Sequence, residues 1–571
     1  MKSKYFNKLI IIVLLLSFGS CENYIEDFFE IKRPQESQWT TTATFEQGLN
    51  KCYINVQWTY AGGKGYPQFL DYLLSGVAML SPGCAVGQQG EQVLNRVFEP
   101  NNIYESVWDI GYNTIALSNL AIDMYENDPD RNPLHLDVSG EDYKNNYLRQ
   151  VAEFHFVRGY TYWWLSKMWA PRYIHNGDNS SIAIPLKTTT SFSMEDIRNE
   201  KLGTVEEVYQ QVIEDLKYAK ENLPDRFTLN SWNNVPGYEC GRANKWVATA
   251  MLGKVYFLMG KYAEAKAEFD EVISYAESTG TYQLEEPRDP FIQARAFNVP
   301  KESIWEFNSG NVDGEYEKVN QYVYPGRNMG FRNRDSQGHE LETSPVNGVG
   351  TTLGGYGGGV AVTIGYTSLK KMGWMVDPLN GDYTVTPEAE ADLRYKQVYH
   401  LMLPYEPGIV KGDPRYITTE SFIGHSLIVT PVVYLDKFFR GEHPYGRFSK
   451  FPLIRLADIY LLRAWLRWKD NDLQGAADYL NLVWNRSNPT NINIYSAANI
   501  THEAIYIEYL REMTGEGWTC DFMMGTQMTI PKGDANLIQD VVDPNTEVPP
   551  PYAGWYWPIP PSEQSLNPNY K

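Results

Sequence analysis

The chain has 571 residues, 43% of them hydrophobic and 21% charged, which is the balance of a soluble globular protein with a large core. Its formal net charge of -20 argues against a general binder of nucleic acid or of anionic membranes, because both require a positive surface. The five cysteines lack CxxC or Cys/His ligand spacing, so the sequence predicts no metal site and no cofactor. It leaves open any disulfide pairing among Cys52, Cys84, Cys240 and Cys520.

The first residues have the form of a secretory signal. Three lysines precede an apolar run at 9–16, which is shorter than the ~20 residues of a membrane-spanning helix. Small residues directly before Cys21 resemble a bacterial lipobox, in which the cysteine becomes lipid-modified after cleavage. We expect a signal peptide at 1–20, lipidation at Cys21 and a tether at 21–39. The alternative is a secreted protein in which Cys21 has no special role.

Four stretches before residue 224 carry apolar residues at helical spacing. They are 40–57, 103–125, 148–168 and 204–223. An aromatic, glycine-containing loop is expected at 58–73, and Thr204 is the expected cap of the fourth helix. We expect the aromatic stripe of the second helix in the core, and His155 of the third as a hydrogen-bonded core residue rather than a ligand.

The segment 244–280 predicts a helical hairpin with its turn at Gly260. Five of its positions reproduce the spacing of the tetratricopeptide signature: Leu252, Gly253, Tyr256, Ala265 and Phe269. The segment 452–487 repeats this pattern in part, with Arg467 at the position of Tyr256. An ordinary amphipathic hairpin is the alternative.

Helical periodicity breaks down in the next part of the chain, where 302–308 alternates like a strand and glycine-rich loops follow. Later, 501–514 predicts the last helix, and the proline-rich tail is expected to be non-helical. The predicted fold is therefore mostly α, with about four tetratricopeptide-like helical hairpins and a long loop-rich insertion carrying short strands. We expect a single domain at 40–571, divided into 40–280, a ligand-binding insertion at 281–451, and 452–571.

Several short motifs occur together with the lipobox and the hairpins. They are KGDPRY at 411–416, FPLIRLADIYLLRAW at 451–465, IEYLREMTGEGW at 507–518 and WPIPPSEQSLNPN at 557–569. In this combination, over essentially the whole chain, the sequence resembles the RagB/SusD family of outer-membrane nutrient-binding lipoproteins.

The resemblance implies a non-catalytic protein that is lipid-anchored in the outer membrane and exposed at the cell surface. It implies capture of a glycan and delivery to a SusC-like TonB-dependent transporter. The family has no fixed ligand residues, so none are transferred to this chain.

Sugars offer CH faces that stack on flat rings and hydroxyls that pair with polar side chains. Two clusters of loop residues fit this chemistry: Trp58, Tyr60 and Tyr66 in the first loop, and Tyr322, Tyr324, Arg327, Arg332, Tyr356, Tyr366 and Trp374 in the insertion. The alternative for each ring is that it anchors its own loop to the scaffold.

Two other functions remain open at this stage. One keeps the family but replaces the glycan by a peptide, as in RagB-type members. The other is a surface glycosidase, which needs two carboxylates about 5–10 Å apart. No HExxH, GxSxG or phosphate-loop motif supports an enzyme. The identity of the glycan and the binding of calcium are not predicted.

Overall fold

The structure is a computed structural model of the chain. It describes residues 42–60, 71–80, 93, 96–100, 102–126, 147–191, 195–196, 200–227, 241–291, 301–307, 362–376, 384–402, 432–435, 437, 451–534 and 546–570. All structural statements below concern these residues. Cys21 and the lipobox lie outside them.

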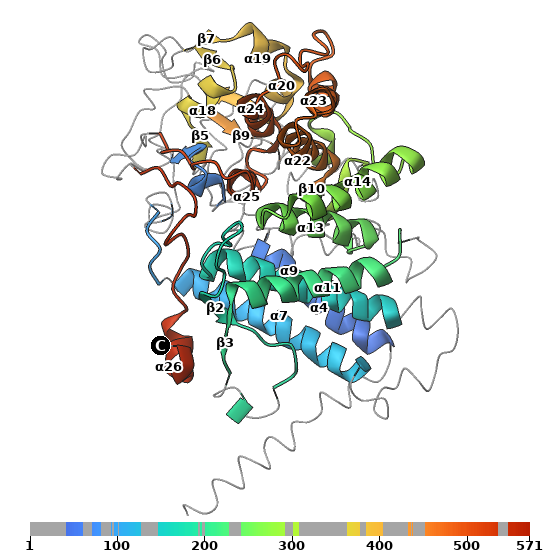
Figure 1. Cartoon of the computed structure of the whole chain (residues 1–571), viewed down its shortest axis with the longest axis vertical. Helices are drawn as coiled ribbons and strands as arrows, with labels where there is room; N and C mark the ends of the chain where they lie inside the picture. The colour runs from blue at the N-terminus through green and yellow to red at the C-terminus, as the bar shows by residue number, and fades with distance from the viewer. Residues whose placement is uncertain are drawn as a thin grey trace, which may run out of the picture.

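Four pairs of helices form the scaffold. They are α4 (Thr42–Tyr60) with α7 (Asn102–Glu126), α9 (Arg149–Trp169) with α11 (Val205–Asn222), α13 (Lys245–Leu258) with α14 (Tyr262–Thr279), and α22 (Leu456–Lys469) with α23 (Leu473–Ser487). Each pair packs on the next through α7 and α9, α11 and α13, and α14 and α22, so the pairs stack in chain order (Figure 1). The mostly helical fold class with tetratricopeptide-like hairpins is confirmed.

The hairpin of α13 and α14 forms as the sequence predicts. Asn244 caps α13 by accepting a hydrogen bond from the backbone of Val247, and Gly260 at the turn has a φ of +74°, a conformation that favours glycine. A Cβ on Gly253 would lie 2.4 Å from the Phe269 ring. The two helices therefore approach closely because Gly253 has no side chain.

The second predicted hairpin begins later than expected. Residues 452–455 belong to strand β10 (Phe451–Arg455), which pairs antiparallel with β4 (Ser303–Phe307), for example Ile454 with Trp305. The predicted strand at 302–308 is confirmed as β4. The boundary at 452 was wrong because a short apolar run before a helix does not reveal by its period whether it is strand or helix.

The insertion contains short elements. They are η2 (Asp289–Phe291), β5 (Val362–Ile364), α18 (Tyr366–Lys371), β6 (Met375–Val376), β7 (Thr384–Val385), α19 (Pro387–Ala391), α20 (Leu393–Val398), β8 (Tyr399–Met402) and β9 (Val432–Leu435). Three of these strands build an antiparallel sheet with β1 (Ala78–Leu80), in the order β1-β5-β9-β8. The hairpin of β2 (Ile182–Pro185) and β3 (Leu202–Thr204) lies between α9 and α11.

Two predictions about the second helical pair are confirmed. Thr204 caps α11 in a capping box with Glu207. His155 is a core residue whose Nδ1 lies 2.7 Å from Asp215 Oδ1, and Arg158 binds the same carboxylate. Its ring also stacks on Tyr218. The geometry gives His155 a packing role.

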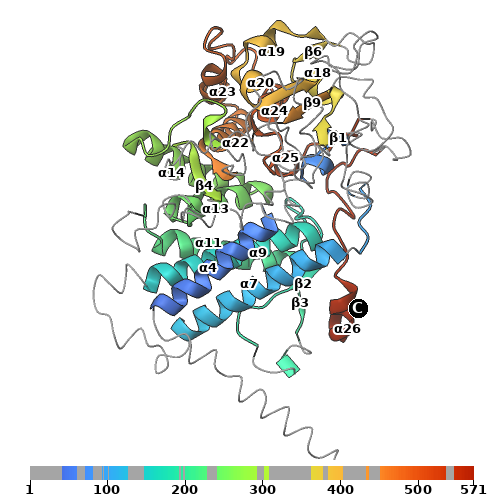
Figure 2. The ribbon, with the colours of Figure 1, turned by 180° about the vertical axis from the view of Figure 1, so that it is seen from behind.

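The C-terminal part contains more helix than predicted. Thr501 caps α24 (His502–Met513) as expected, but α25 (Thr519–Gly525), α26 (Pro561–Leu566) and η4 (Pro568–Tyr570) follow. The non-helical tail was a wrong prediction, because Pro561 occupies the first helical position, where no backbone N–H is needed. In both views α26 lies beside β2 and β3 (Figures 1 and 2). Among the helices that the structure describes, none has the length and apolarity to cross a bilayer.

Candidate functional site

The first predicted aromatic cluster does not lie wholly in a loop. Helix α4 continues to Tyr60, so Trp58 and Tyr60 belong to its last turn. The prediction of a loop from residue 58 was wrong there because no glycine interrupts the helical pattern before Gly62. The side chains of these two residues and the whole of Tyr66 lie outside the described part of the structure.

Two residues of the second cluster are described, and both are buried. Trp374 is 1% exposed and its ring packs against those of Tyr395 and Tyr399, with centroids 5.5 and 4.8 Å away. Tyr366, the first residue of α18, is 8% exposed. A buried ring has no free face for a sugar, so the structure gives these two side chains a packing role.

The other members of the second cluster lie outside the described residues: Tyr322, Tyr324, Arg327, Arg332 and Tyr356. The sheet nevertheless fixes where their segment rejoins the fold. Leu80, at the end of β1, pairs with Val362, at the start of β5, and the end of β9 lies at the same edge because β9 runs antiparallel to β5. Leu80, which precedes 81–92, and Val362, which follows 308–361, are therefore neighbours at one end of the sheet.

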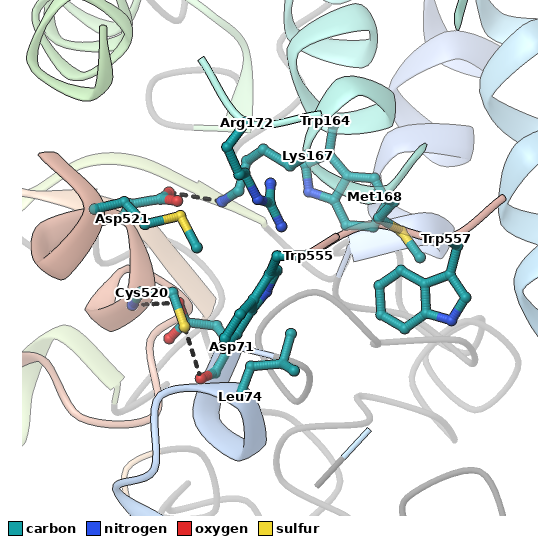
Figure 3. A pocket seen from close by; sticks show the side chains of 11 residues that line it. Asp71, Leu74, Trp164, Lys167, Met168, Arg172, Cys520, Asp521, Trp555 and Trp557 are labelled. Atoms are coloured by element: carbon teal, nitrogen blue, oxygen red, sulfur yellow. Dashed lines mark hydrogen bonds and ion pairs between the residues drawn. The ribbon is translucent and has the colours of Figure 1, made fainter. Parts of the chain in front are cut away.

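A pocket lies between the C-terminal end of α9, helix α25 and the tail of the chain (Figure 3). It is lined by Asp71, Leu74, Trp164, Lys167, Met168, Arg172, Cys520, Asp521, Met524, Trp555 and Trp557. The space between these atoms, with the open mouth included, is about 460 Å³. Sequence analysis missed this pocket because four separated segments build it.

Three of the charged groups in the pocket already have partners. Lys167 Nζ lies 2.6 Å from Asp521 Oδ2, and it also lies 4.4 Å from the centre of the Trp163 ring. Asp71 accepts hydrogen bonds from the backbone N–H groups of Thr519 and Cys520, at 3.0 and 2.8 Å, and so holds the start of α25. Burial, followed by the nearby Asp521, raises the pKa of Asp71 to about 7.

The acidic residues of the motif at 507–518 lie in a buried ionic network rather than in an open site. Arg455 bonds to Glu302, Glu512 and Glu516, and Arg394 bonds to Asp392, Glu508 and Glu512. Lys437, Arg486 and Arg511 add three more cations. Five cations thus face five carboxylates.

The network sets the ionisation of Glu512. Burial alone would raise the pKa of Glu512, but Arg486, Arg455 and Arg394 hold it well below its usual range. Glu512 therefore does not donate a proton at neutral pH. The described motif carboxylates Glu508, Glu512 and Glu516 are all paired with buried cations, and these pairs connect parts of the fold. Within the described residues, no group of three or more His, Cys, Asp or Glu side chains is arranged to hold a metal ion.

Comparison with known proteins agrees with this architecture. Residues 27–257 match a family described as "Starch-binding associating with outer membrane", and residues 432–571 match the SusD family. The chain belongs to the SusD/RagB family. SusD-like protein P2 of Formosa agariphila is 25% identical over 268 residues, which are 47% of this chain and 46% of that protein. The match thus spans about half the length of that relative.

Solved SusD structures show the same fold over most of the chain. A SusD superfamily protein from Bacteroides thetaiotaomicron has a TM-score of 0.64 at 21% identity, covering 93% of this chain and 98% of that one. A structure named "Laminarin binding SusD-like protein" has a TM-score of 0.55 at 19% identity, covering 85% of this chain and 91% of that one.

In this SusD/RagB protein the closing motif also has a structural role. Asn567 Nδ2 donates to the backbone oxygen of Glu200 at 3.0 Å, and the Tyr570 hydroxyl donates to the Glu200 carboxylate at 2.8 Å. These bonds fasten the tail to the loop between α9 and α11. Among the motif residues that the structure describes, Arg455, Glu508, Glu512 and Asn567 thus have structural contacts. The KGDPRY motif at 411–416 lies outside the described residues.

Proposed function

We propose that this chain is a non-catalytic glycan-binding lipoprotein of the outer membrane that passes its ligand to a SusC-like TonB-dependent transporter. The observation that carries the proposal is the match of residues 27–257 to a family described as starch-binding and associated with the outer membrane. The likeness to a laminarin-binding SusD-like structure supports the same class of ligand.

The proposed ligand contacts are the loop aromatics and the two arginines of the insertion. Aromatic rings stack on the CH faces of sugars, and an arginine fork pairs with hydroxyls or with an acidic sugar. The segment that carries Tyr322 and Tyr324 ends at Val362, which pairs with Leu80 in the sheet. The buried Tyr366 and Trp374 are left out of the proposed contact surface.

Affinity electrophoresis against a panel of polysaccharides, with laminarin and starch included, tests the proposal. We expect at least one glycan to retard the protein without release of reducing sugar. Binding of peptide mixtures alone would instead favour the RagB-type alternative. Release of sugar products by the purified protein would favour a glycosidase.

The contact surface is tested by changing Tyr322 and Tyr324 to Ala. Each stacking ring contributes about 1 kcal/mol, so a single change weakens glycan binding roughly fivefold while the melting curve stays the same. Tyr479→Ala on α23 is the control, since this ring packs on Tyr460 in the repeat scaffold. Unchanged affinity in both loop variants would give those rings a purely structural role.

The lipid anchor is tested by Cys21→Ala in the full-length chain expressed in its native cell type. The variant lacks the thiol that takes the lipid, so we expect it to move from the membrane fraction to the soluble fraction. Continued retention of Cys21→Ala in membranes would contradict an anchor at this residue.

A further inference from the structure

Arg172 lines the pocket without an ion pair to any residue that the structure describes. Its guanidinium points into the pocket (Figure 3), and no hydrogen bond or ion pair joins it to any residue that the structure describes. Its Nε atom is buried. Burial lowers the pKa of this guanidinium, as expected for a cation that is desolvated without an adequate partner.

The neighbouring charged side chains make their hydrogen bonds and ion pairs with other groups. The Lys167 ammonium and the Asp521 carboxylate neutralise one another at 2.6 Å. The Asp71 carboxyl is taken by the backbone of α25. Among the pocket side chains that the structure describes, Arg172 is therefore the cation without a hydrogen bond or ion pair, although the charge of the nearby Asp521 favours its charged form.

Two more polar atoms of the pocket are buried without a partner in the described structure. They are Oδ1 of Asp521, a residue 8% exposed, and Nε1 of Trp555, a residue 2% exposed. Together with Arg172 Nε they offer two donors and one acceptor. The apolar part of the lining consists of Leu74, Met168 and Met524 beside the indole rings. The three unpaired atoms can exchange hydrogen bonds with a small polar ligand in the pocket.

We propose that this pocket binds a small hydroxycarboxylate. The planar fork of Arg172 matches a carboxylate, which takes charge-assisted hydrogen bonds from it. The Trp555 indole N–H supplies a further donor to the same group. The hydroxyl of the ligand donates to Asp521 Oδ1, and its carbon body rests on the apolar lining. The inference does not rest on the proposed function.

Isothermal titration of the folded full-length mature protein with sodium lactate tests the inference. Propionate, which lacks the hydroxyl, and lactamide, which lacks the charge, are the matched ligands. We expect saturable binding of lactate, and at least about tenfold weaker binding of lactamide, the usual weight of a hydrogen bond to a charged group. Propionate is expected to bind more weakly than lactate because it leaves Asp521 Oδ1 unpaired.

Arg172→Gln is expected to weaken lactate binding by at least about tenfold. Arg172→Lys keeps the positive charge but loses the planar fork. We expect its affinity for lactate to lie between those of the parent protein and Arg172→Gln. Arg288→Gln is the control, because its side chain is 46% exposed and distant in sequence from the pocket segments. A thermal melt verifies that each variant is folded; Arg172 has no described partner to lose, so we expect little change.

Three results would each overturn the inference. The first is no saturable binding of lactate, in which case the pocket holds water only. The second is equal affinity of Arg172→Gln and the parent protein. The third is equal affinity for propionate and lactate, which would remove the proposed role of Asp521.

Discussion

Asp71 shows how one buried residue combines a structural task with an unusual ionisation. Its carboxyl holds the first N–H groups of α25 and lies near Asp521, so its charge is disfavoured by burial and by a like charge. The pKa of Asp71 rises from 3.8 to about 7. The folded state therefore keeps a proton that the unfolded chain has already lost, and stability falls as the pH rises through this window.

Asp71→Asn should remove this pH dependence. The Asn amide keeps one oxygen that accepts a hydrogen bond from the backbone of α25, and it carries no charge. At low pH the variant should therefore be about 1 kcal/mol less stable than the parent protein, because the other hydrogen bond to α25 is lost. Between pH 5 and pH 8 the parent loses about 3 kcal/mol relative to the variant, because only the parent must ionise a buried carboxyl. Denaturant unfolding at both pH values measures this difference. Asp225 is 62% exposed, so Asp225→Asn should lose as much stability between the two pH values as the parent protein does. An equal loss of stability in all three proteins would contradict the raised pKa of Asp71.

At the scale of the element, the sequence specified the helices more securely than their partners. The spacing of apolar residues predicted the hairpin of α13 and α14, with Gly253 at one of the tetratricopeptide signature positions. The structure adds that its neighbour is the fully buried Phe269 ring. A run of letters does not reveal which side chain fills the space opposite a glycine.

Gly253→Ala should destabilise the protein despite the higher helix propensity of alanine. The new Cβ would lie 2.4 Å from a ring that has no room to move, and overpacking of this kind costs about 1–3 kcal/mol. Gly475→Ala is the matched control, since its Cβ meets the ends of Arg467 and Asp472, which are 31% and 48% exposed. Thermal unfolding compares the two variants. Equal melting temperatures would show that α14 moves away from the new Cβ of residue 253 at little energetic cost.

At the scale of the whole molecule, the buried ionic network joins the insertion to the C-terminal helices. Asp392, Arg394 and Lys437 come from the insertion, whereas Glu508, Glu512 and Glu516 belong to α24 and the turn after it. Arg455 links Glu512 and Glu516 to Glu302, directly before β4. The network thus connects the C-terminal helices to the insertion that separates them, in the sequence, from the first three helical pairs.

Arg455→Met should destabilise the fold by about 3–5 kcal/mol, because three buried carboxylates lose a shared cation. Limited proteolysis should then cut the chain faster within 281–451. Arg467→Met removes an exposed pair with Asp472 and should cost no more than about 1 kcal/mol. A variant of Arg455 as stable as that of Arg467 would mean that the network contributes little.

The sequence by itself determined the helices of the four pairs and α24, the strand β4, the caps at Thr204 and Thr501, and the family, because these depend on local periodicity and on motifs of short span. Only the tertiary structure decided that Trp374 is buried, that the motif acids are paired with cations, and that Arg172 meets Asp521 and Trp555 in one pocket. Those facts depend on tertiary contacts between separate segments of the chain. A side chain's exposure and ionisation follow from such neighbours, and they are not encoded in the spacing of residues along the chain.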